Sequence, residues 1–262
     1  MRLAGKVALV TGAGRGMGRR YALGLAKEGA AVAVNDVEAD NAAKTAEEVE
    51  AQGSRAVALG GDVSKKEDTG LMVSEVTKAF GKVDILINNA GVNPFILPAE
   101  QIKEEGWDRV MDVNLKGVFF CCQAVFPVMK DQGGGRIINI SSQAGLFGEQ
   151  GLLAYCVSKA GVLALTRVLA YEWSRYGISV NAVAPGFIAA GMNEPILGKS
   201  ELVSALAERV PQKRFAEPEE MVSVVVFLSG EEAAYINGAT IVVDGGMGGY
   251  PPNPIIDLIR KR

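Results

Sequence analysis

Seven short apolar runs, rich in β-branched residues and separated by helical patterns, constrain the fold of this 262-residue chain most strongly. They span residues 6–10, 31–35, 56–59, 83–87, 136–141, 178–183 and 240–243. Strands that alternate with helices form a parallel sheet covered by helices on both faces. We therefore predict an α/β fold: one doubly wound domain with a seven-stranded parallel sheet, without repeats or an interdomain linker.

The composition narrows the classes of function. The net charge is −3 and only the last three residues form a basic block, which argues against nucleic acid as a partner. We find neither an apolar signal core nor a membrane-spanning run. The three cysteines, Cys121, Cys122 and Cys156, lack the spacing of a zinc site, so we predict no metal and reduced thiols in the cytoplasm.

The chain contains no histidine. This absence excludes Ser-His-Asp and Cys-His mechanisms as well as zinc held by histidine. Any proton transfer must therefore use tyrosine, lysine, aspartate, glutamate or cysteine.

Residues 136–159 carry the candidate for that chemistry. A strand ends at Ser142, a loop with three glycines follows, and a helix is expected from Leu153 to about Tyr176. Tyr155 and Lys159 are four residues apart and share one face of that helix. A nearby ammonium lowers the pKa of a phenol, and a serine hydroxyl can hold a substrate oxygen. The alternative is an ordinary helix with a surface tyrosine and lysine.

A glycine-rich turn, T-G-A-G-R-G-M-G at residues 11–18, follows the first strand. Strand, glycine turn and helix form the phosphate-binding unit of a dinucleotide fold. The strict G-x-G-x-x-G pattern fails, because Met17 stands where the third glycine belongs. The glycines are Gly12, Gly14, Gly16 and Gly18. A flexible turn without a ligand is the alternative.

Asp36 ends the second strand, about 20 residues after the glycine turn, where a carboxylate can bind a ribose 2′-hydroxyl. The same charge repels a 2′-phosphate, so we predict NAD rather than NADP, although Arg15 is placed to attract a phosphate. Asp62 is expected to meet the adenine edge. Both acids have an alternative role as helix caps, for 38–52 and 64–80.

Three further segments are of interest. Residues 88–91, Asn-Asn-Ala-Gly, form a polar turn at the end of the fourth strand, and Asn114 lies in a predicted helix over 106–131. Residues 187–215 are either a substrate lid or a plain loop insertion. The tail 248–262 is either a frayed terminus or a segment that docks on a neighbouring subunit or closes the pocket.

Together these motifs resemble the classical short-chain dehydrogenase/reductase family over about residues 3–247. Thr11-Gly12-x-x-x-Gly16-x-Gly18 is similar to its variant glycine motif, and Asn88-Asn89-Ala90-Gly91 to its sheet-stabilising motif. Pro185-Gly186 resembles the turn beside the nicotinamide. The resemblance implies a Rossmann-type dinucleotide-binding domain over 1–247, including the lid.

The resemblance also implies roles for single residues. Tyr155 would be the general acid/base, Lys159 would lower its pKa and bind the nicotinamide ribose, Ser142 would hold the substrate oxygen, and Asn114 would bend its helix around a relay water. Residues expected to bind the cofactor are Gly12, Arg15, Gly16, Met17, Gly18, Asp36, Asp62, Val63, Asn89, Gly91, Tyr155, Lys159, Pro185, Gly186 and Ile188. Candidates for the substrate pocket are Asn93, Phe95, Gln143, Gln150, Phe187 and Met192. A homotetramer is implied as well.

One departure concerns the nicotinamide carboxamide, because Ala189 and Ala190 stand where the family often has a threonine.

The sequence leaves three hypotheses about function. The first is an NAD-dependent oxidoreductase that interconverts a secondary alcohol (polyol, sugar or hydroxy acid) and its carbonyl. The alternative is a 3-oxoacyl-thioester (acyl-carrier-protein) reductase using NADPH, with Arg209, Lys213 and Arg214 as the nearby basic group. The third is a cofactor-binding protein without turnover.

Overall fold

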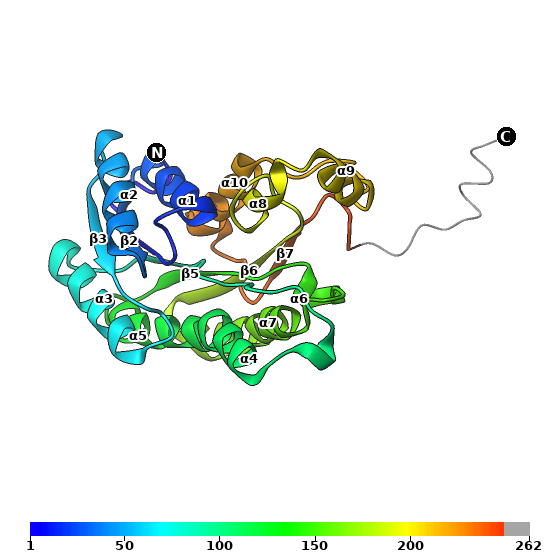
Figure 1. The fold of residues 1–262 in the computed structure, drawn as a ribbon. Coiled ribbons are helices and arrows are strands. Elements are labelled where there is room, and N and C mark those ends of the chain that lie inside the picture. Colours follow the sequence, from blue (N-terminus) through cyan, green and yellow to red (C-terminus); the bar gives the residue numbers. More distant parts are fainter. Residues whose placement is uncertain (249–262) are drawn as a thin grey trace.

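The computed structural model describes residues 1–248, so the predictions for the tail beyond Gly248 lie outside the described residues. Seven parallel strands form one sheet in the order β3-β2-β1-β4-β5-β6-β7 (Figure 1), which confirms the predicted fold class. The strands are β1 (Val7–Val10), β2 (Ala31–Asp36), β3 (Ala56–Gly60), β4 (Ile85–Asn88), β5 (Gly135–Ile140), β6 (Ile178–Pro185) and β7 (Thr240–Val243).

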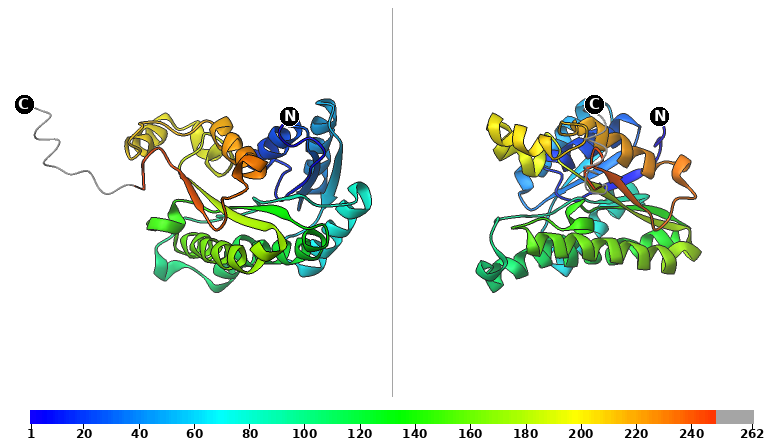
Figure 2. Two further views of the ribbon diagram at one scale, coloured as in Figure 1. Left: turned by 180° about the vertical axis from the view of Figure 1, so that it is seen from behind. Right: turned by 90° about the vertical axis from the view of Figure 1, so that its right-hand side faces the viewer.

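Helices cover both faces of this sheet. The main ones are α1 (Gly16–Lys27), α2 (Ala39–Ala51), α3 (Lys66–Phe80), α4 (Glu104–Met111), α5 (Gly117–Asp131), α7 (Leu153–Trp173) and α10 (Pro218–Ser229). Figures 1 and 2 show α1, α2 and α10 on one face and α3, α5 and α7 on the other. Each face has its own buried apolar cluster, around Leu25 and Val225 on the first and Val125 and Val162 on the second.

The strand order reverses between β1 and β4, which lie side by side although β2 and β3 intervene in sequence. In open parallel sheets, ligands bind at the carboxyl ends of the strands beside such a reversal. The glycine turn after β1 and the polar turn after β4 both lie at this edge.

Residues 187–215 leave the sheet after β6 and carry two short helices, α8 (Glu194–Leu197) and α9 (Ser200–Glu208). No residue of α8 or α9 is buried. The short helix α6 (Ala144–Phe147) lies at the same end of the molecule as α9 (Figures 1 and 2).

The predicted helical segment over 106–131 is present, but it is not one regular α-helix. The segment divides into α4, a π-helical turn (Asp112–Lys116) and α5. Asn114 lies in the π turn with no exposed surface. A π turn carries one more residue than an α turn, and such turns mark functional sites.

Helix α1 begins at Gly16, so the last glycines of the turn already belong to the helix. Asp36 is not the N-cap of α2. That position belongs to Glu38, whose N–H donates to the Asp36 carboxylate at 3.1 Å.

By length and composition alone, Leu153–Tyr176 also qualifies as a membrane span, with a mean hydropathy of 1.4. The sequence prediction had found no such run. The helix lies against the sheet and buries apolar residues such as Val162, Leu163 and Leu169 there. Its apolar composition therefore has an explanation in the packing of the core.

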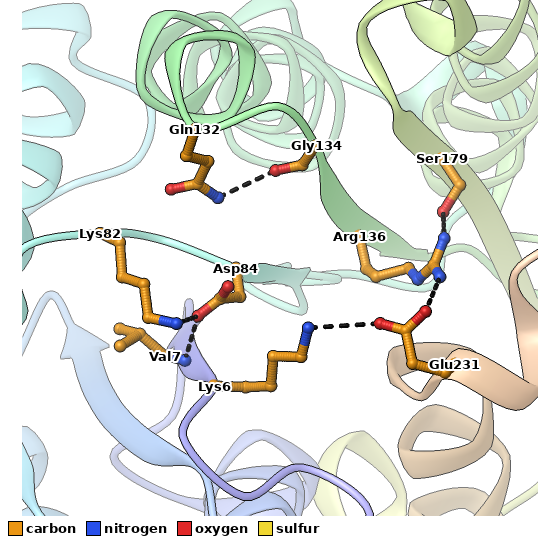
Figure 3. A network of polar contacts seen from close by, with 9 residues as sticks. All are labelled: Lys6, Val7, Lys82, Asp84, Gln132, Gly134, Arg136, Ser179 and Glu231. Atoms are coloured by element: carbon orange, nitrogen blue, oxygen red, sulfur yellow. Dashed lines mark hydrogen bonds and ion pairs between the residues drawn. The ribbon is translucent and has the colours of Figure 1, made fainter.

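A polar network closes the opposite edge of the sheet, at the amino ends of the strands (Figure 3). Arg136 donates to Ser179 at 3.2 Å and pairs with Glu231, also at 3.2 Å, while Lys6 donates to the same carboxylate. Asp84 accepts the N–H of Val7 at 2.7 Å. These bonds join β1, β4, β5 and β6 away from the candidate site.

Two glycines allow a matched test of the glycine turn. A Cβ at Gly18 would collide with the carbonyl oxygen of Gly12, whereas a Cβ at Gly70, inside α3, would meet nothing within 4 Å. We expect Gly18→Ala to lower the free energy of unfolding by about 1–3 kcal/mol. Gly70→Ala should raise it by about 0.5–1 kcal/mol. Urea unfolding measures both; a Gly18→Ala protein as stable as the wild type would contradict the described turn.

Candidate active site

The candidate cofactor site begins at the glycine turn between β1 and α1. Gly12 has φ +59°, and a Cβ there would stand 2.8 Å from Cα of Ala90. The Asn89 amide donates to the carbonyl oxygens of Thr11 at 2.9 Å and Gly12 at 3.0 Å. The turn is thus fixed against the end of β4, and the first amides of α1 point outward, as an anion site at a helix N-terminus requires.

Asp36 lies beside this turn and is 7% exposed. Its carboxylate accepts the N–H of Gly14 at 2.9 Å, which orients the acid toward the space beyond the turn. Arg15, the N-cap residue of α1, is exposed. Both charged residues named from the sequence therefore border the glycine turn.

A hollow next to Asp36 suits an adenine ring. It is lined by Val37, Gly60, Gly61, Asp62, Lys65, Asp68 and Leu71. Asp62 both lines it and accepts two hydrogen bonds from Ser64, at 3.0 Å and 2.7 Å. Asp62 is not the N-cap of α3, because that position belongs to Lys65, and its contact with adenine stays a prediction.

Three of the four predicted catalytic residues meet at the ends of β5 and α7. The Ser142 hydroxyl lies near enough to the Tyr155 hydroxyl to act on it and favours a lower pKa of that group. The Lys159 ammonium stands 5.7 Å from the centre of the Tyr155 ring and donates to the carbonyl oxygen of Ile140 at 2.8 Å. Ser141 donates to the carbonyl oxygen of Lys159 at 2.8 Å, so two hydrogen bonds join the end of β5 to α7.

Burial dominates the ionisation of this group. It raises the pKa of Tyr155; the Ser142 hydroxyl opposes the rise and the neighbouring Cys156 adds to it. Burial also lowers the pKa of Lys159 from 10.5 to about 8. The expected lowering of the tyrosine pKa by Lys159 does not dominate in the protein alone.

Asn114, the fourth residue, is joined to the others indirectly. Its side chain accepts from the N–H of Val92 at 2.7 Å and donates to the Val92 carbonyl at 2.9 Å. It also donates to Ser158 at 3.2 Å, and Ser158 donates to the carbonyl oxygen of Tyr155 at 2.7 Å. Sequence reasoning missed Ser158, although its position three residues after Tyr155 and next to Lys159 was a usable signal.

A second missed group lies beneath the site. The buried Asn88 amide donates to Asn139 at 2.8 Å, and the Asn139 amide donates to Thr166 at 2.9 Å. Asn139 and Thr166 have no exposed surface. This ladder joins β4, β5 and α7 through side chains alone.

The other predicted cofactor residues divide into two groups. Gly91 is central: a Cβ there would stand 3.5 Å from the Lys159 ammonium and 3.4 Å from the Asn114 side-chain oxygen. The side chains of Val63 and Ile188 are buried in the two apolar clusters, so only their backbone groups are available to a cofactor.

The turn after β6 completes the cofactor side. The Pro185 carbonyl accepts from Gln143, and the Gly186 N–H donates to Val243, both at 2.9 Å. Met17 packs toward Gly191. The segment 187–215 therefore borders the glycine turn.

The predicted substrate residues differ in their burial and in the groups that they contact. Gln143 is buried, Phe187 stacks on Phe215 at 5.2 Å, and the Met192 methyl approaches Gly91. Asn93 has a buried side-chain oxygen without a partner among the described residues. Gln150 is exposed, and Phe95 packs against Gly106 of α4 instead of a catalytic residue.

Comparison with known proteins gives consistent matches along the chain. A family model described as enoyl-(acyl carrier protein) reductase matches residues 12–248. The chain is 45% identical over 243 residues to the 3-oxoacyl-[acyl-carrier-protein] reductase FabG of Staphylococcus epidermidis, covering 92% of this chain and 98% of that protein.

Two solved structures are similar as well. A putative short-chain alcohol dehydrogenase from Sinorhizobium meliloti superposes with a TM-score of 0.89 at 40% identity, covering 94% of this chain and 97% of that one. A gluconate 5-dehydrogenase from Burkholderia cenocepacia, solved with NADP and tartrate, gives 0.91 at 34% identity, covering 95% and 98%.

The buried ammonium of Lys159 generates a stability test. It is 3% exposed, and the fall of its pKa from 10.5 to about 8 corresponds to a burial penalty on the order of 3 kcal/mol. Lys159→Met removes the charge but leaves the Ile140 carbonyl without its donor, so we expect a net gain of about 1–2 kcal/mol at pH 7.

The gain should depend on pH. Between pH 8 and 10.5 the native lysine loses its proton while the unfolded one keeps it, so the wild type gains stability as pH rises and the gap closes. Urea unfolding of the wild type and Lys159→Met across this pH range measures the difference in stability. Lys44→Met, at an exposed lysine, is the control. A wild type more stable than Lys159→Met at pH 7 would contradict the burial penalty.

Proposed function

Since the chain belongs to the classical short-chain dehydrogenase/reductase family, whose NAD(P)-dependent oxidoreductases act on CH–OH groups, we propose that it interconverts a 3-oxoacyl thioester and its 3-hydroxyacyl form. The observation that carries the proposal is the 45% identity to a 3-oxoacyl-[acyl-carrier-protein] reductase over nearly the whole of both chains. The comparisons favour this reading over the polyol or sugar dehydrogenase that ranked first from the sequence.

The arrangement of the side chains supports the chemistry. The Ser142 hydroxyl acts on that of Tyr155 from close by, so both hydroxyls would reach one substrate oxygen. Tyr155 would give its proton to the carbonyl oxygen during reduction and take it back during oxidation. A bound nicotinamide cofactor would supply the hydride. Lys159, held by Ile140, would orient the ribose, and the π turn at Asn114 would position the backbone for a relay water.

For the cofactor we propose NAD(H) over NADP(H). The N–H of Gly14 fixes the Asp36 carboxylate beside the glycine turn, where it would accept from a ribose 2′-hydroxyl and repel a 2′-phosphate. Arg15 and the NADP in the Burkholderia neighbour are the opposing observations. The buried Ala190 offers no hydroxyl to the carboxamide, so that contact would rest on backbone groups.

The basic group of Arg209, Lys213 and Arg214 argues against an acidic carrier protein as the carrier of the thioester. Arg209 pairs with Glu149 at 2.7 Å, Lys213 with Glu208 at 3.0 Å, and Arg214 with Glu220 at 2.6 Å. Three neutralised cations do not form an open basic surface for an acidic carrier protein. The proposal therefore concerns the thioester, whatever its carrier.

A second candidate is an NAD-dependent dehydrogenase of a sugar acid. The structural likeness to a gluconate 5-dehydrogenase and the position of Asp36 favour it. Turnover of acetoacetyl thioesters with NADH, compared with gluconate and NAD⁺, separates the two. Absence of activity on acetoacetyl thioesters would remove the first proposal, and absence on both would favour a binding protein without turnover.

We also propose the assembly, domain division and location implied by the family. Large apolar side chains remain exposed along α7 and α5, namely Leu153, Val157, Val168, Tyr171 and Phe119, which supports a homotetramer. The unburied α8 and α9 support a lid over 187–215 within a domain of residues 1–247. Three free cysteines support a reducing cytoplasm.

Tyr155→Phe tests the mechanism. Loss of the only proposed proton donor should lower kcat at least about 100-fold, while NADH binding, followed by its fluorescence, should remain within about twofold. Tyr171→Phe on the same helix, at 88% exposure, is the matched control. Full activity in Tyr155→Phe would exclude the proposed role.

The cofactor proposal is tested by titration with NADH and NADPH. We expect NADH to bind at least about tenfold tighter, a difference of about 1.4 kcal/mol. Asp36→Asn removes the charge and keeps one acceptor oxygen, for the N–H of either Gly14 or Glu38, so it should narrow or reverse the preference for NADH. Asp40→Asn in the first turn of α2 is the control. Tighter NADPH binding by the wild type would overturn the charge argument.

A further inference from the structure

One ion pair joins the segment 187–215 to the loop between α6 and α7. Arg209, directly after α9, donates to Glu149 at 2.7 Å. Glu149 belongs to the short loop between α6 and α7, and its N–H contacts the Cys156 sulfur, next to Tyr155. The pair therefore connects the lid to the loop that leads into the catalytic helix.

This pair differs from the two other ion pairs of the basic group. Lys213 binds both the carboxylate and the carbonyl oxygen of Glu208, five residues away. Arg214 binds Glu220, six residues away, through two hydrogen bonds, and Glu220 also caps α10. Both of these cations are used locally, whereas the partner of Arg209 is 60 residues distant.

Neighbouring side chains hold the guanidinium of Arg209 in position. Its guanidinium lies 5.8 Å from the centre of the Phe187 ring, and Phe187 directly follows the Pro185-Gly186 turn. Phe187 is itself supported by the buried Phe215. Within residues 1–248, one guanidinium nitrogen of Arg209 has a hydrogen-bond partner, out of five N–H donors that an arginine offers.

We propose that Arg209 binds an anionic group of the substrate, a carboxylate or a phosphate, with Glu149 as the internal anion that holds the site beforehand. The inference rests on the proposed function, because it names a charge on the substrate of that same site. A substrate anion would use the remaining donors of the guanidinium. Glu149 then weakens anion binding by repulsion while it keeps the arginine in place.

Three substrates with one reacting group test the charge. Acetoacetyl-N-acetylcysteamine is neutral, acetoacetyl-CoA carries phosphates on the handle, and 3-oxoadipyl-N-acetylcysteamine carries a carboxylate on the acyl chain. We expect Arg209→Gln to raise KM for an anionic thioester about tenfold more than for the neutral one. An effect confined to the CoA ester identifies phosphate as the anion, and one confined to the 3-oxoadipyl ester identifies carboxylate.

Glu149→Gln should change KM in the opposite direction, because it removes the repulsion between the Glu149 carboxylate and the substrate anion. We expect it to lower KM for the same anionic thioester severalfold relative to the neutral one. Lys213→Gln, on the same segment, should leave these ratios unchanged. If Arg209→Gln changes all three substrates equally or changes none, the pair only fastens the lid and the inference is overturned.

Failure of the proposed function can be distinguished from failure of the anion site. A wild type that reduces none of the thioesters refutes the function but not the anion site, because binding requires no turnover. Calorimetric titration of the NAD⁺-loaded protein with acetoacetyl-CoA and with 3-oxoadipyl-N-acetylcysteamine then decides. About tenfold weaker binding of one of them by Arg209→Gln supports the site; equal binding, or no binding by the wild type, refutes it.

Discussion

The hydrogen bonds from Asn88 to Asn139 and from Asn139 to Thr166 are the interaction on which the candidate site depends. They run through a buried interface where an unpaired amide costs about 1–3 kcal/mol, so the register of β4, β5 and α7 is strongly specified. With the register fixed, Ser141 meets the backbone of Lys159, and Lys159 meets that of Ile140. The spacing between Ser142 and Tyr155 follows from the core and not from the loop between them.

Several local features work against stability and serve the site instead. Lys159 keeps an ammonium in a buried position, Asn88 leaves a side-chain oxygen without a partner among the described residues, and the π turn interrupts a long helix at Asn114. All three lie within one layer, at the carboxyl ends of β4 and β5. The polar network around Arg136 stabilises the other edge of the sheet, where it does not compete with ligand binding.

Predictability varied with the range of the interactions involved. The seven strands could be located because their apolar runs and turn residues are local signals. A bend at Asn114 was implied by the family resemblance, but local signals could not show the π turn, because it depends on Val92 and Ser158, which lie 22 and 44 residues away. Ladder residues such as Thr166 look like any polar residue in a core helix. The ionisation of Tyr155 was misjudged, since spacing shows a neighbouring charge but not the extent of burial.

By itself, the sequence determined the fold class, the glycine turn, the order of the motifs and the absence of histidine chemistry, since each depends on residue type and short spacing. Only the tertiary structure decided which side chains complete the site. It joined Asn114 to Tyr155 through Ser158, directed the side chains of Val63 and Ile188 into the core, and placed Glu149 against Arg209. These outcomes depend on packing between segments far apart in the chain, where burial and pairing set the energies and spacing carries no information.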